Sequence, residues 1–209
     1  MLQLKNTSKS FGSHQVFSID ELRLPGGIYR LKGVNGSGKS TFLNMLAGLL
    51  PFKGDIILND TISIRDKPVA YRRYINHAPA EPLYPSFATG ESLVAFVRAV
   101  KKGNEEQVQQ IRTALDIGHY LANPTGSYSS GMLKKLSLLM AFTGQPAWIL
   151  LDEPFTTLDQ SSQQALAGLI RSYHEKGVSF MITSHHDMDT MDIGFSCQFS
   201  FRDKQLRED

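Results

Sequence analysis

Short apolar runs alternate along the chain with stretches in which apolar residues recur every three or four positions. The short runs predict β-strands, and the longer stretches predict helices. The run Trp148–Leu151 is continuously apolar, which is typical of a strand buried inside a parallel sheet. The strands expected from these runs are Leu2–Thr7, Val16–Leu24, Ile28–Gly33, Asp55–Leu58, Tyr71–His77, Trp148–Leu151 and Val178–Thr183.

Helical spacing of apolar residues is found in five parts of the chain. In the last of them Asp159 is a candidate N-cap, and Gly177 ends the helix. Because strands and helices alternate, we predict a doubly wound α/β core with the mostly helical stretch 79–146 inserted into it. The expected helical segments are the apolar face of Phe42, Met45, Leu46, Leu49 and Leu50, followed by Leu93–Val100, Val108–Leu115, Met132–Phe142 and Gln160–Lys176.

Composition narrows the class of protein without identifying it. The 209 residues suffice for one domain with an inserted subdomain, and the 41% of hydrophobic residues is ordinary for a globular protein. A net charge of +2 argues against a dedicated nucleic-acid partner. The lone Cys197 excludes an intrachain disulfide and fits a reducing, cytoplasmic compartment. No run approaches the roughly 18 consecutive apolar residues of a membrane span.

A glycine-rich segment follows the strand expected at Ile28–Gly33. The sequence GVNGSGKST at residues 33–41 satisfies the phosphate-loop pattern, with a strand before it and a helix after it. Its glycines let successive backbone N–H groups face phosphate oxygens. We predict that Lys39 reaches the β- and γ-phosphates and that the Ser40 hydroxyl is a ligand of Mg²⁺. The nucleotide-binding residues expected here are Asn35, Gly36, Ser37, Gly38, Lys39, Ser40 and Thr41.

Two carboxylates, Asp152 and Glu153, follow the buried strand Trp148–Leu151. In open α/β sheets, ligands bind at the carboxyl ends of the strands. We expect Asp152 to hold Mg²⁺ through its water shell, and Glu153 to orient or deprotonate the water that attacks the γ-phosphate. Alone, the pair also fits a strand that ends in a polar turn. The phosphate loop favours the catalytic interpretation.

A second anion site is indicated in the stretch SYSSGMLKKLSLLM, residues 127–140. Apolar residues at helical spacing predict a helix that begins near Gly131, with Ser129 and Ser130 around its first turn. A helix N-terminus offers unpaired N–H groups and partial positive charge, which suit an anion. Since the chain already has a phosphate loop, the pattern raises the question of what this second site serves.

The phosphate loop, the YSSGM stretch and the ILLDEP stretch, in this order and spacing, resemble nucleotide-binding subunits of ATP-binding cassette (ABC) transporters. The resemblance runs from Phe11 to His185 and is strongest with exporter-type ATPases, whose membrane permeases are separate chains. It implies a P-loop NTPase core with a mostly parallel sheet, an N-terminal antiparallel β-subdomain and an inserted α-helical subdomain. Residues 1–209 would then be a single ATP-binding domain, with the helical subdomain at about 79–146.

The same resemblance implies an answer to the question of the second anion site. Ser129–Met132 would stand in the signature loop of the family, which closes over ATP bound to the opposite subunit. The chain would therefore form a homodimer with shared ATP sites. Ser129 and Gly131 match the phosphate-contacting serine and the second glycine of that loop, whereas Ser130 replaces its first glycine and Met132 its glutamine.

Other roles are also implied only by the resemblance. Phe11 stands where the family has a ring that stacks on adenine, although a plain core aromatic residue is the alternative. Thr157–Asp159 resembles the loop that crosses the dimer interface. His185 stands in register with the histidine that contacts the γ-phosphate, with His186 as the alternative.

The clearest departure from the family pattern lies in the stretch HAPAEP, residues 77–82. The family has glutamine, sometimes glutamate, at the position that aligns with Ala80, where the side chain approaches Mg²⁺ and the lytic water. Alanine has no group for this role. Either Glu81 replaces it after a shift of one residue, or the function is weakened. The departure concerns coupling to the membrane partner more than ATP binding.

The sequence therefore predicts an Mg²⁺-dependent ATPase subunit that powers a separate transmembrane permease, with export favoured, from the cytoplasmic face of the membrane. One alternative is a soluble ABC ATPase without a transport role, although such proteins usually carry large insertions or fused cassettes. Another is a nucleotide-binding regulator with little turnover, for which Ala80 is the best argument. A P-loop kinase would not need the YSSGM loop. The transported substrate does not follow from the sequence.

Overall fold

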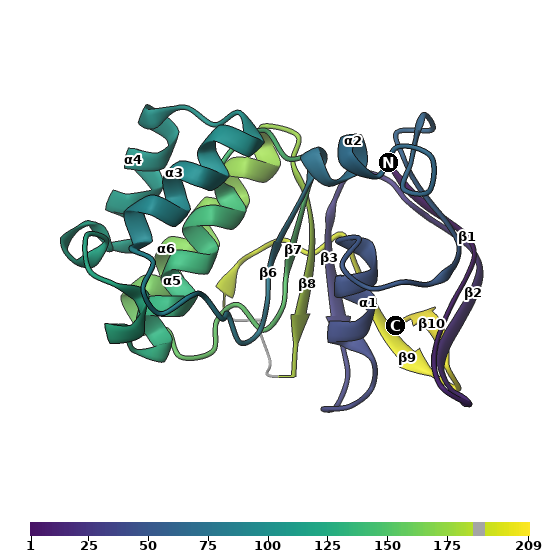
Figure 1. Cartoon of the computed structure of the whole chain (residues 1–209). Helices are drawn as coiled ribbons and strands as arrows, with labels where there is room; N and C mark the ends of the chain where they lie inside the picture. Colours follow the sequence, from purple (N-terminus) through teal and green to yellow (C-terminus); the bar gives the residue numbers. More distant parts are fainter. Residues whose placement is uncertain (186–190) are drawn as a thin grey trace.

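Five parallel strands form the centre of the fold (Figure 1). In the computed structural model, which describes residues 1–185 and 191–209, a six-stranded sheet has the order β10-β9-β3-β8-β7-β6. Only β10 runs antiparallel to its neighbour among these strands. The bounds are β3 Ile28–Lys32, β6 Ile75–Ala78, β7 Trp148–Leu151, β8 Ser179–Ser184, β9 Cys197–Arg202 and β10 Gln205–Glu208.

A second sheet is built from the early part of the chain. It has four antiparallel strands in the order β2-β1-β4-β5, and it faces the central sheet across helix α1 (Figure 1). The turn at Pro25–Gly27 leads the chain from this sheet into the parallel one. The bounds are β1 Leu2–Phe11, β2 His14–Leu24, β4 Lys53–Leu58 and β5 Ile62–Ser63.

Helices cover both faces of the parallel sheet. In Figure 1, α3, α4, α5 and α6 gather on one side, and α1 lies on the other side between the two sheets. Among the described residues, no helix is both long and apolar enough to cross a bilayer. The helices are α1 Lys39–Leu46, α2 Pro68–Tyr74, α3 Gly90–Lys101, α4 Glu105–Leu115, α5 Ser130–Phe142 and α6 Gln160–Glu175, with short 3₁₀ turns at Gly118–Tyr120 and Thr125–Ser127.

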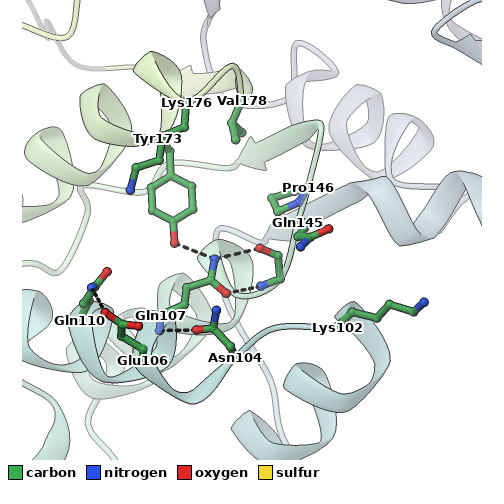
Figure 2. A pocket seen from close by; sticks show the side chains of 11 residues that line it. Lys102, Asn104, Glu106, Gln107, Gln110, Gln145, Pro146, Tyr173, Lys176 and Val178 are labelled. Carbon is green, nitrogen blue, oxygen red and sulfur yellow. Dashed lines mark hydrogen bonds between the residues drawn. The ribbon is translucent and has the colours of Figure 1, made fainter.

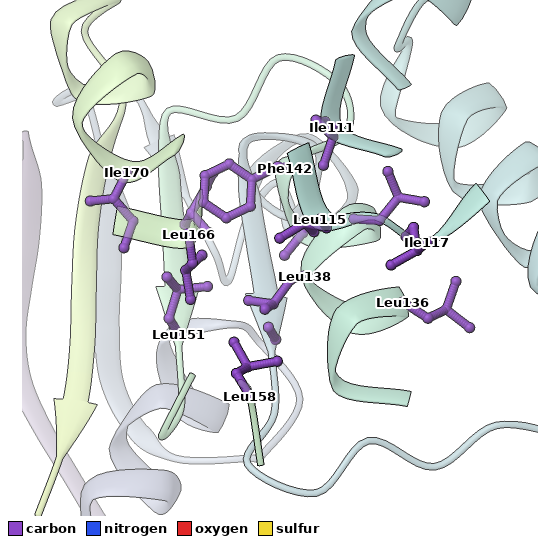
Figure 3. Close-up of a cluster of buried hydrophobic side chains, with 14 of the residues drawn as sticks. Ile111, Leu115, Ile117, Leu136, Leu138, Phe142, Leu151, Leu158, Leu166 and Ile170 are labelled. Atoms are coloured by element: carbon purple, nitrogen blue, oxygen red, sulfur yellow. The ribbon is translucent and has the colours of Figure 1, made fainter. Parts of the chain in front are cut away.

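The sheet separates two hydrophobic cores because successive side chains of a strand point to opposite faces. In β7, Ile149 and Leu151 belong to the core under α4–α6, whereas Trp148 and Leu150 belong to the core around α1. The first core is shown in Figure 3, where Leu138 and Phe142 of α5 meet Leu166 and Ile170 of α6. Both sides of β7 are therefore buried, as its continuous apolar run predicts.

The expected fold class is confirmed, with three corrections to the elements. Helix α1 ends at Leu46, so Leu49 and Leu50 do not belong to its apolar face, and Leu49 is exposed. Tyr71–His77 is not one strand, because Pro68 starts helix α2 and the chain becomes extended only at Ile75. Tyr71 is buried within α2 and donates a hydrogen bond from its hydroxyl to Leu46 O. Strands β9 and β10 were not expected, although Cys197, Phe199 and Phe201 alternate with polar residues and face the α1 core.

Candidate functional site

The phosphate loop connects the carboxyl end of β3 to the N-terminus of α1. Gly33, Gly36 and Gly38 all have positive φ angles, of 150°, 82° and 102°, so the loop curls in a way that glycine permits. A Cβ on Gly38 would lie 2.9 Å from Val16 Cγ1, which shows how closely β2 backs the loop. The first intrahelical bond of α1 runs from Phe42 N–H to Gly38 O. The N–H groups of Lys39, Ser40 and Thr41, in the first turn of α1, therefore have no partner within the helix and are available to a ligand.

Lys39 is buried and directs its ammonium group along the loop. Its Nζ donates to the carbonyl oxygens of Gly33 at 2.6 Å and Val34 at 3.3 Å. The same Nζ lies 3.8 Å from Glu153 Oε1. The structure thus brings the predicted phosphate lysine and the predicted catalytic carboxylate together.

Asp152 follows β7 and is 2% exposed. Its Oδ1 accepts a hydrogen bond of 2.6 Å from the hydroxyl of Thr183, at the end of β8. The same hydroxyl accepts a bond of 2.8 Å from Glu153 N–H. Thr183 therefore fixes both predicted site carboxylates, through the side chain of one and the backbone of the other.

Glu153 lies between a lysine and a histidine. Its backbone has a φ of 46°, an uncommon left-handed conformation for this residue type. Its Oε2 is 2.9 Å from His185 Nδ1, and His185 N–H donates to the same oxygen at 3.4 Å. The histidine predicted to contact the γ-phosphate is thus in contact with the predicted base. The alternative, His186, lies outside the described residues.

A buried lysine that was not predicted lies behind these carboxylates. Lys134 of α5 donates from Nζ to the carbonyl oxygens of Pro79, Ala80 and Asp152. Burial lowers the pKa of Lys134 to about 8, while the charges of Asp152, Glu153 and Glu81 act in the opposite direction. The site therefore contains a second cation besides Lys39. It comes from α5, which lies on the opposite face of the sheet from α1.

His77 of β6 completes the cluster. Its Nε2 is buried without a hydrogen-bond partner among the described residues. Burial lowers its pKa to about 4; the charge of Asp152 raises that pKa and the charge of Lys134 lowers it further. The imidazole is consequently neutral near pH 7.

The donor set fits Mg²⁺, which prefers oxygen ligands. The Ser40 hydroxyl is exposed in the first turn of α1, and Asp152 supplies a buried carboxylate from the strand end. Ser37 Oγ and Glu153 Oε1 are buried and have no hydrogen-bond partner among the described residues. Buried polar atoms normally have a partner, so these two indicate that the site is built to receive a polar group.

The YSSGM stretch is placed apart from the phosphate loop. Ser129 is the N-cap of α5, and its hydroxyl accepts the N–H of Met132 at 3.3 Å. A Cβ on Gly131 would lie 2.9 Å from the carbonyl oxygen of Thr157, so glycine permits close contact between these two loops. Within the described part of the chain, no hydrogen bond or ion pair joins Ser129 or Gly131 to residues 33–41.

Phe11 ends β1, and its ring is 53% exposed. Lys9 Nζ lies 4.6 Å from the ring centroid, on the face of the aromatic system. Phe11 is therefore not a core residue, which removes the alternative explanation for it. Adenine stacking on this ring stays a prediction.

A large cavity of about 480 Å³ lies away from the carboxylate cluster, beside the amino ends of β7 and β8 (Figure 2). Its centre is the amide of Gln107, which donates to Gly144 O and Tyr173 Oη and accepts from Gly144 N–H. These bonds tie α4 to α6 and to the loop before β7. Because none of the predicted site residues lines this cavity, it is not the candidate site.

Sequence reasoning missed Thr183 and Lys134. Thr183 is a polar residue near the end of a buried apolar strand, where a hydroxyl must find a partner. Lys134 lies four residues before Leu138, on the apolar face of α5 rather than on its polar side. A lysine in an apolar stripe is the signal that would have indicated a buried cation.

The parallel sheet and the phosphate loop at its edge define a P-loop nucleotide-binding domain. The sequence profile described as ABC transporter matches residues 22–156. The chain belongs to this family, as one of its ATP-binding domains. A solved structure described as the ATP-binding subunit of an ABC transporter superposes on all of the chain and 89% of its own, with a TM-score of 0.89 and 22% identity.

The curated relatives are ATP-binding proteins with different transport roles. The human phospholipid-transporting ATPase ABCA7 is 30% identical over 88% of the chain, which spans 9% of that relative's length. The lantibiotic transport protein SrtF of Streptococcus pyogenes is 29% identical over 88% of the chain and 80% of its own. The glucose import protein GlcV of Saccharolobus solfataricus is 27% identical over 91% of the chain and 57% of its own. The relatives therefore include both import and other transport proteins.

Proposed function

We propose that the chain binds ATP with Mg²⁺ and hydrolyses it at sites shared by two copies, and so powers a separate transmembrane permease, in the direction of export. The position of Glu153 between Lys39 and His185 is the observation that carries this proposal. Glu153 as the base, Lys39 as the phosphate-binding cation and His185 as the histidine that contacts the γ-phosphate would thereby lie at one edge of the sheet. ADP and phosphate would be the products.

The residues of the chain divide the work of hydrolysis. Lys39 and the loop N–H groups would bind the β- and γ-phosphates and hold the γ-phosphate in line with the attacking water. Glu153 would accept the proton of that water, and its contact with His185 orients the carboxylate for this task. Ser40 and Asp152 would hold Mg²⁺, which neutralises phosphate charge when bound.

The second half of each site would come from the other copy. Gly131 packs closely against the carbonyl of Thr157, and within the described part of the chain no hydrogen bond or ion pair joins Ser129 or Gly131 to residues 33–41. Ser129 is exposed at a helix N-terminus, where the N–H groups of α5 favour an anion. A γ-phosphate bound by one chain would then be closed off by the YSSGM stretch of its partner, with Phe11 stacked on adenine.

An apolar surface on the chain supports a membrane-protein partner. A groove of about 370 Å³ is lined by Leu49, Leu83 and Val97, among others, next to the loop that follows β6. Leu83 is 89% exposed. Phe87, in the same loop between β6 and α3, and Phe96, on α3, are also exposed apolar side chains. Exposed apolar patches mark interaction sites. A permease seated here would hold the chain at the cytoplasmic face of the membrane.

Two further parts of the proposal concern the extent of the domain and the kind of partner. We take residues 1–209 as one ATP-binding domain, with residues 79–146 as its helical subdomain, because α3, α4 and α5 all lie in that stretch. The near-neutral net charge of +2 supports a partner other than nucleic acid.

The Glu153→Gln variant tests this function. The amide cannot accept a proton, so kcat for ATP hydrolysis should fall by about 100-fold or more while ATP binding is kept. Phosphate release measures turnover, and light scattering should show an ATP-bound dimer that accumulates in the variant. Glu175→Gln, the same exchange at an exposed position of α6, is the control and should leave both unchanged.

Two outcomes would contradict the proposal in different ways. Wild-type turnover in Glu153→Gln would refute the role of this carboxylate. A wild-type protein that binds ATP without turnover would instead support a nucleotide-binding regulator, the alternative that the alanine at position 80 favours.

A further inference from the structure

Lys134 is 1% exposed, which is rare for a lysine. Its neighbour Lys135 shows the ordinary arrangement, with an ion pair of 3.4 Å to Asp159 and a partly exposed side chain. A buried ammonium costs free energy unless it is paired and hydrogen-bonded. The location of Lys134 therefore calls for specific partners.

Those partners are carbonyl oxygens from two different segments. Lys134 Nζ donates to Pro79 O at 3.1 Å and to Ala80 O in the loop after β6, and to Asp152 O at 3.4 Å at the end of β7. An ammonium group has three donors, and these three contacts use all of them. The side chain therefore joins α5, the loop after β6 and the segment that carries both site carboxylates.

The backbone strengthens the same connection. Asp152 N–H donates to Ala78 O at 2.9 Å, while Asp152 O accepts from Lys134. Both backbone groups of Asp152 therefore help to hold the end of β7 to the end of β6. The two carbonyls held by Lys134 come directly after this link. Without the ammonium, three carbonyl oxygens at the strand ends would lose this donor, and the loop after β6 would lose its side-chain connection through Lys134 to the end of β7.

Nearby negative charge favours the position of the Lys134 ammonium beside the site. The carboxylates of Asp152, Glu153 and Glu81 all stabilise the charged form of Lys134. The ammonium is therefore attracted toward the carboxylates of the site while it bonds to the backbone beside them. A neutral side chain of the same length would keep the packing and lose both effects.

We propose that Lys134 is a positioning residue for ATP hydrolysis, which fixes the backbone of Asp152 relative to the loop 79–80 and so sets the geometry of Asp152 and Glu153. This inference rests on the proposed function, in which those two carboxylates act on the water and on Mg²⁺. Lys134 acts through the backbone and does not touch the nucleotide. Since it lies on the helix that begins beside Ser129, it also connects the YSSGM stretch to the carboxylates of its own chain.

The test compares three single variants with the wild-type chain. Lys134→Met keeps the length of the side chain without charge or donors, and Lys134→Arg keeps charge and donors. Lys5→Met, at an exposed position of β1 far from the site in sequence, is the control. For Lys134→Met we expect kcat for ATP hydrolysis to fall by about tenfold or more, with KM for ATP within about threefold of wild type. Lys134→Arg should recover a large part of kcat, and Lys5→Met should leave kcat at the wild-type value.

A second measurement needs no nucleotide. Hydrogen–deuterium exchange of the free protein should be faster in Lys134→Met for peptides that cover residues 79–84 and 152–154, and unchanged in the phosphate loop. If Lys134→Met does not fold, Lys134→Gln, which keeps two uncharged amide N–H donors on a shorter side chain, takes its place in both measurements.

The outcomes separate the two proposals. Exchange and kcat that remain at wild-type values in the Lys134 variants would overturn the positioning role. A loss of thermal stability with unchanged kcat per ATP-binding molecule would show a merely structural role and would also overturn it. A wild-type chain without turnover would count against the proposed function alone, and hydrogen exchange would then decide whether Lys134 holds the two segments together.

Discussion

The neutral His77 makes the stability of the fold depend on pH in a direction that can be worked out. Its pKa is lowered to about 4 in the folded state, from an ordinary value of 6.5, chiefly by burial. Between these two pH values the unfolded chain binds a proton that the folded chain does not. Stability from this group is therefore complete above pH 6.5 and is lost as the pH falls toward 4.

The size of the effect follows from the same two pKa values. Complete loss corresponds to about 3 kcal/mol, and between pH 7.5 and pH 5 the expected loss is about 2 kcal/mol. This is a large part of the roughly 5–15 kcal/mol that stabilises a typical domain. The variant His77→Leu cannot be protonated, so this part of the loss should vanish from it.

The assay is urea unfolding followed by circular dichroism at pH 7.5 and at pH 5, for wild type and His77→Leu. The quantity compared is the difference in unfolding free energy between the two pH values, because the substitution also changes absolute stability. That difference should be smaller in His77→Leu by about 2 kcal/mol. His119→Gln, at an exposed histidine, is the control and should have unfolding free energies within about 0.5 kcal/mol of wild type at both pH values. Equal differences in wild type and His77→Leu would refute the reasoning.

Two further predictions concern the partners of the chain. Leu83→Glu, in the apolar groove, should abolish co-purification of a multi-span permease from solubilised membranes, whereas Val69→Glu, at another highly exposed apolar position, on α2, should not. Co-purification that survives Leu83→Glu would exclude this groove as the contact. In a Glu153→Gln background, Lys39→Ala chains and Ser129→Arg chains should each fail to form an ATP-dependent dimer alone. When mixed they should form a heterodimer, because one of its two sites then pairs an intact Lys39 with an intact Ser129. Differently tagged chains detect this heterodimer, and its absence from a mixture of folded variants would reject the shared site.

The elements that could be predicted from sequence are those in which local pattern and tertiary environment agree. The buried strand β7 carries a run of apolar residues because both of its faces are covered. The phosphate loop could be predicted because its glycines, its lysine and the flanking elements are all local in sequence. The helical insertion at 79–146 was expected from the spacing of its apolar residues, whereas the antiparallel β-subdomain was expected from the resemblance.

The elements that were missed depend on contacts between distant segments. The aromatic residues of Tyr71–Tyr74 favour a strand by propensity, but Pro68 and the bond from Tyr71 to Leu46 O produce a helix. The pairing of Lys134 with carbonyls more than fifty residues earlier has no local signature. The strand β9 is different, because its clean alternation was visible in the sequence and was overlooked.

The attachments of α5 have a mechanical consequence. Lys134 binds the carbonyl of Asp152, a Cβ has no room between Gly131 and Thr157, and Lys135 pairs with Asp159. All three connections lead to the same short segment, residues 152–159. A rotation of α5 must therefore move this segment together with the helix. Because Lys134 also binds the carbonyls of Pro79 and Ala80, any hinge between the helices and the sheet has to lie beyond Ala80 in the loop after β6, or at the segment that joins α5 to β7.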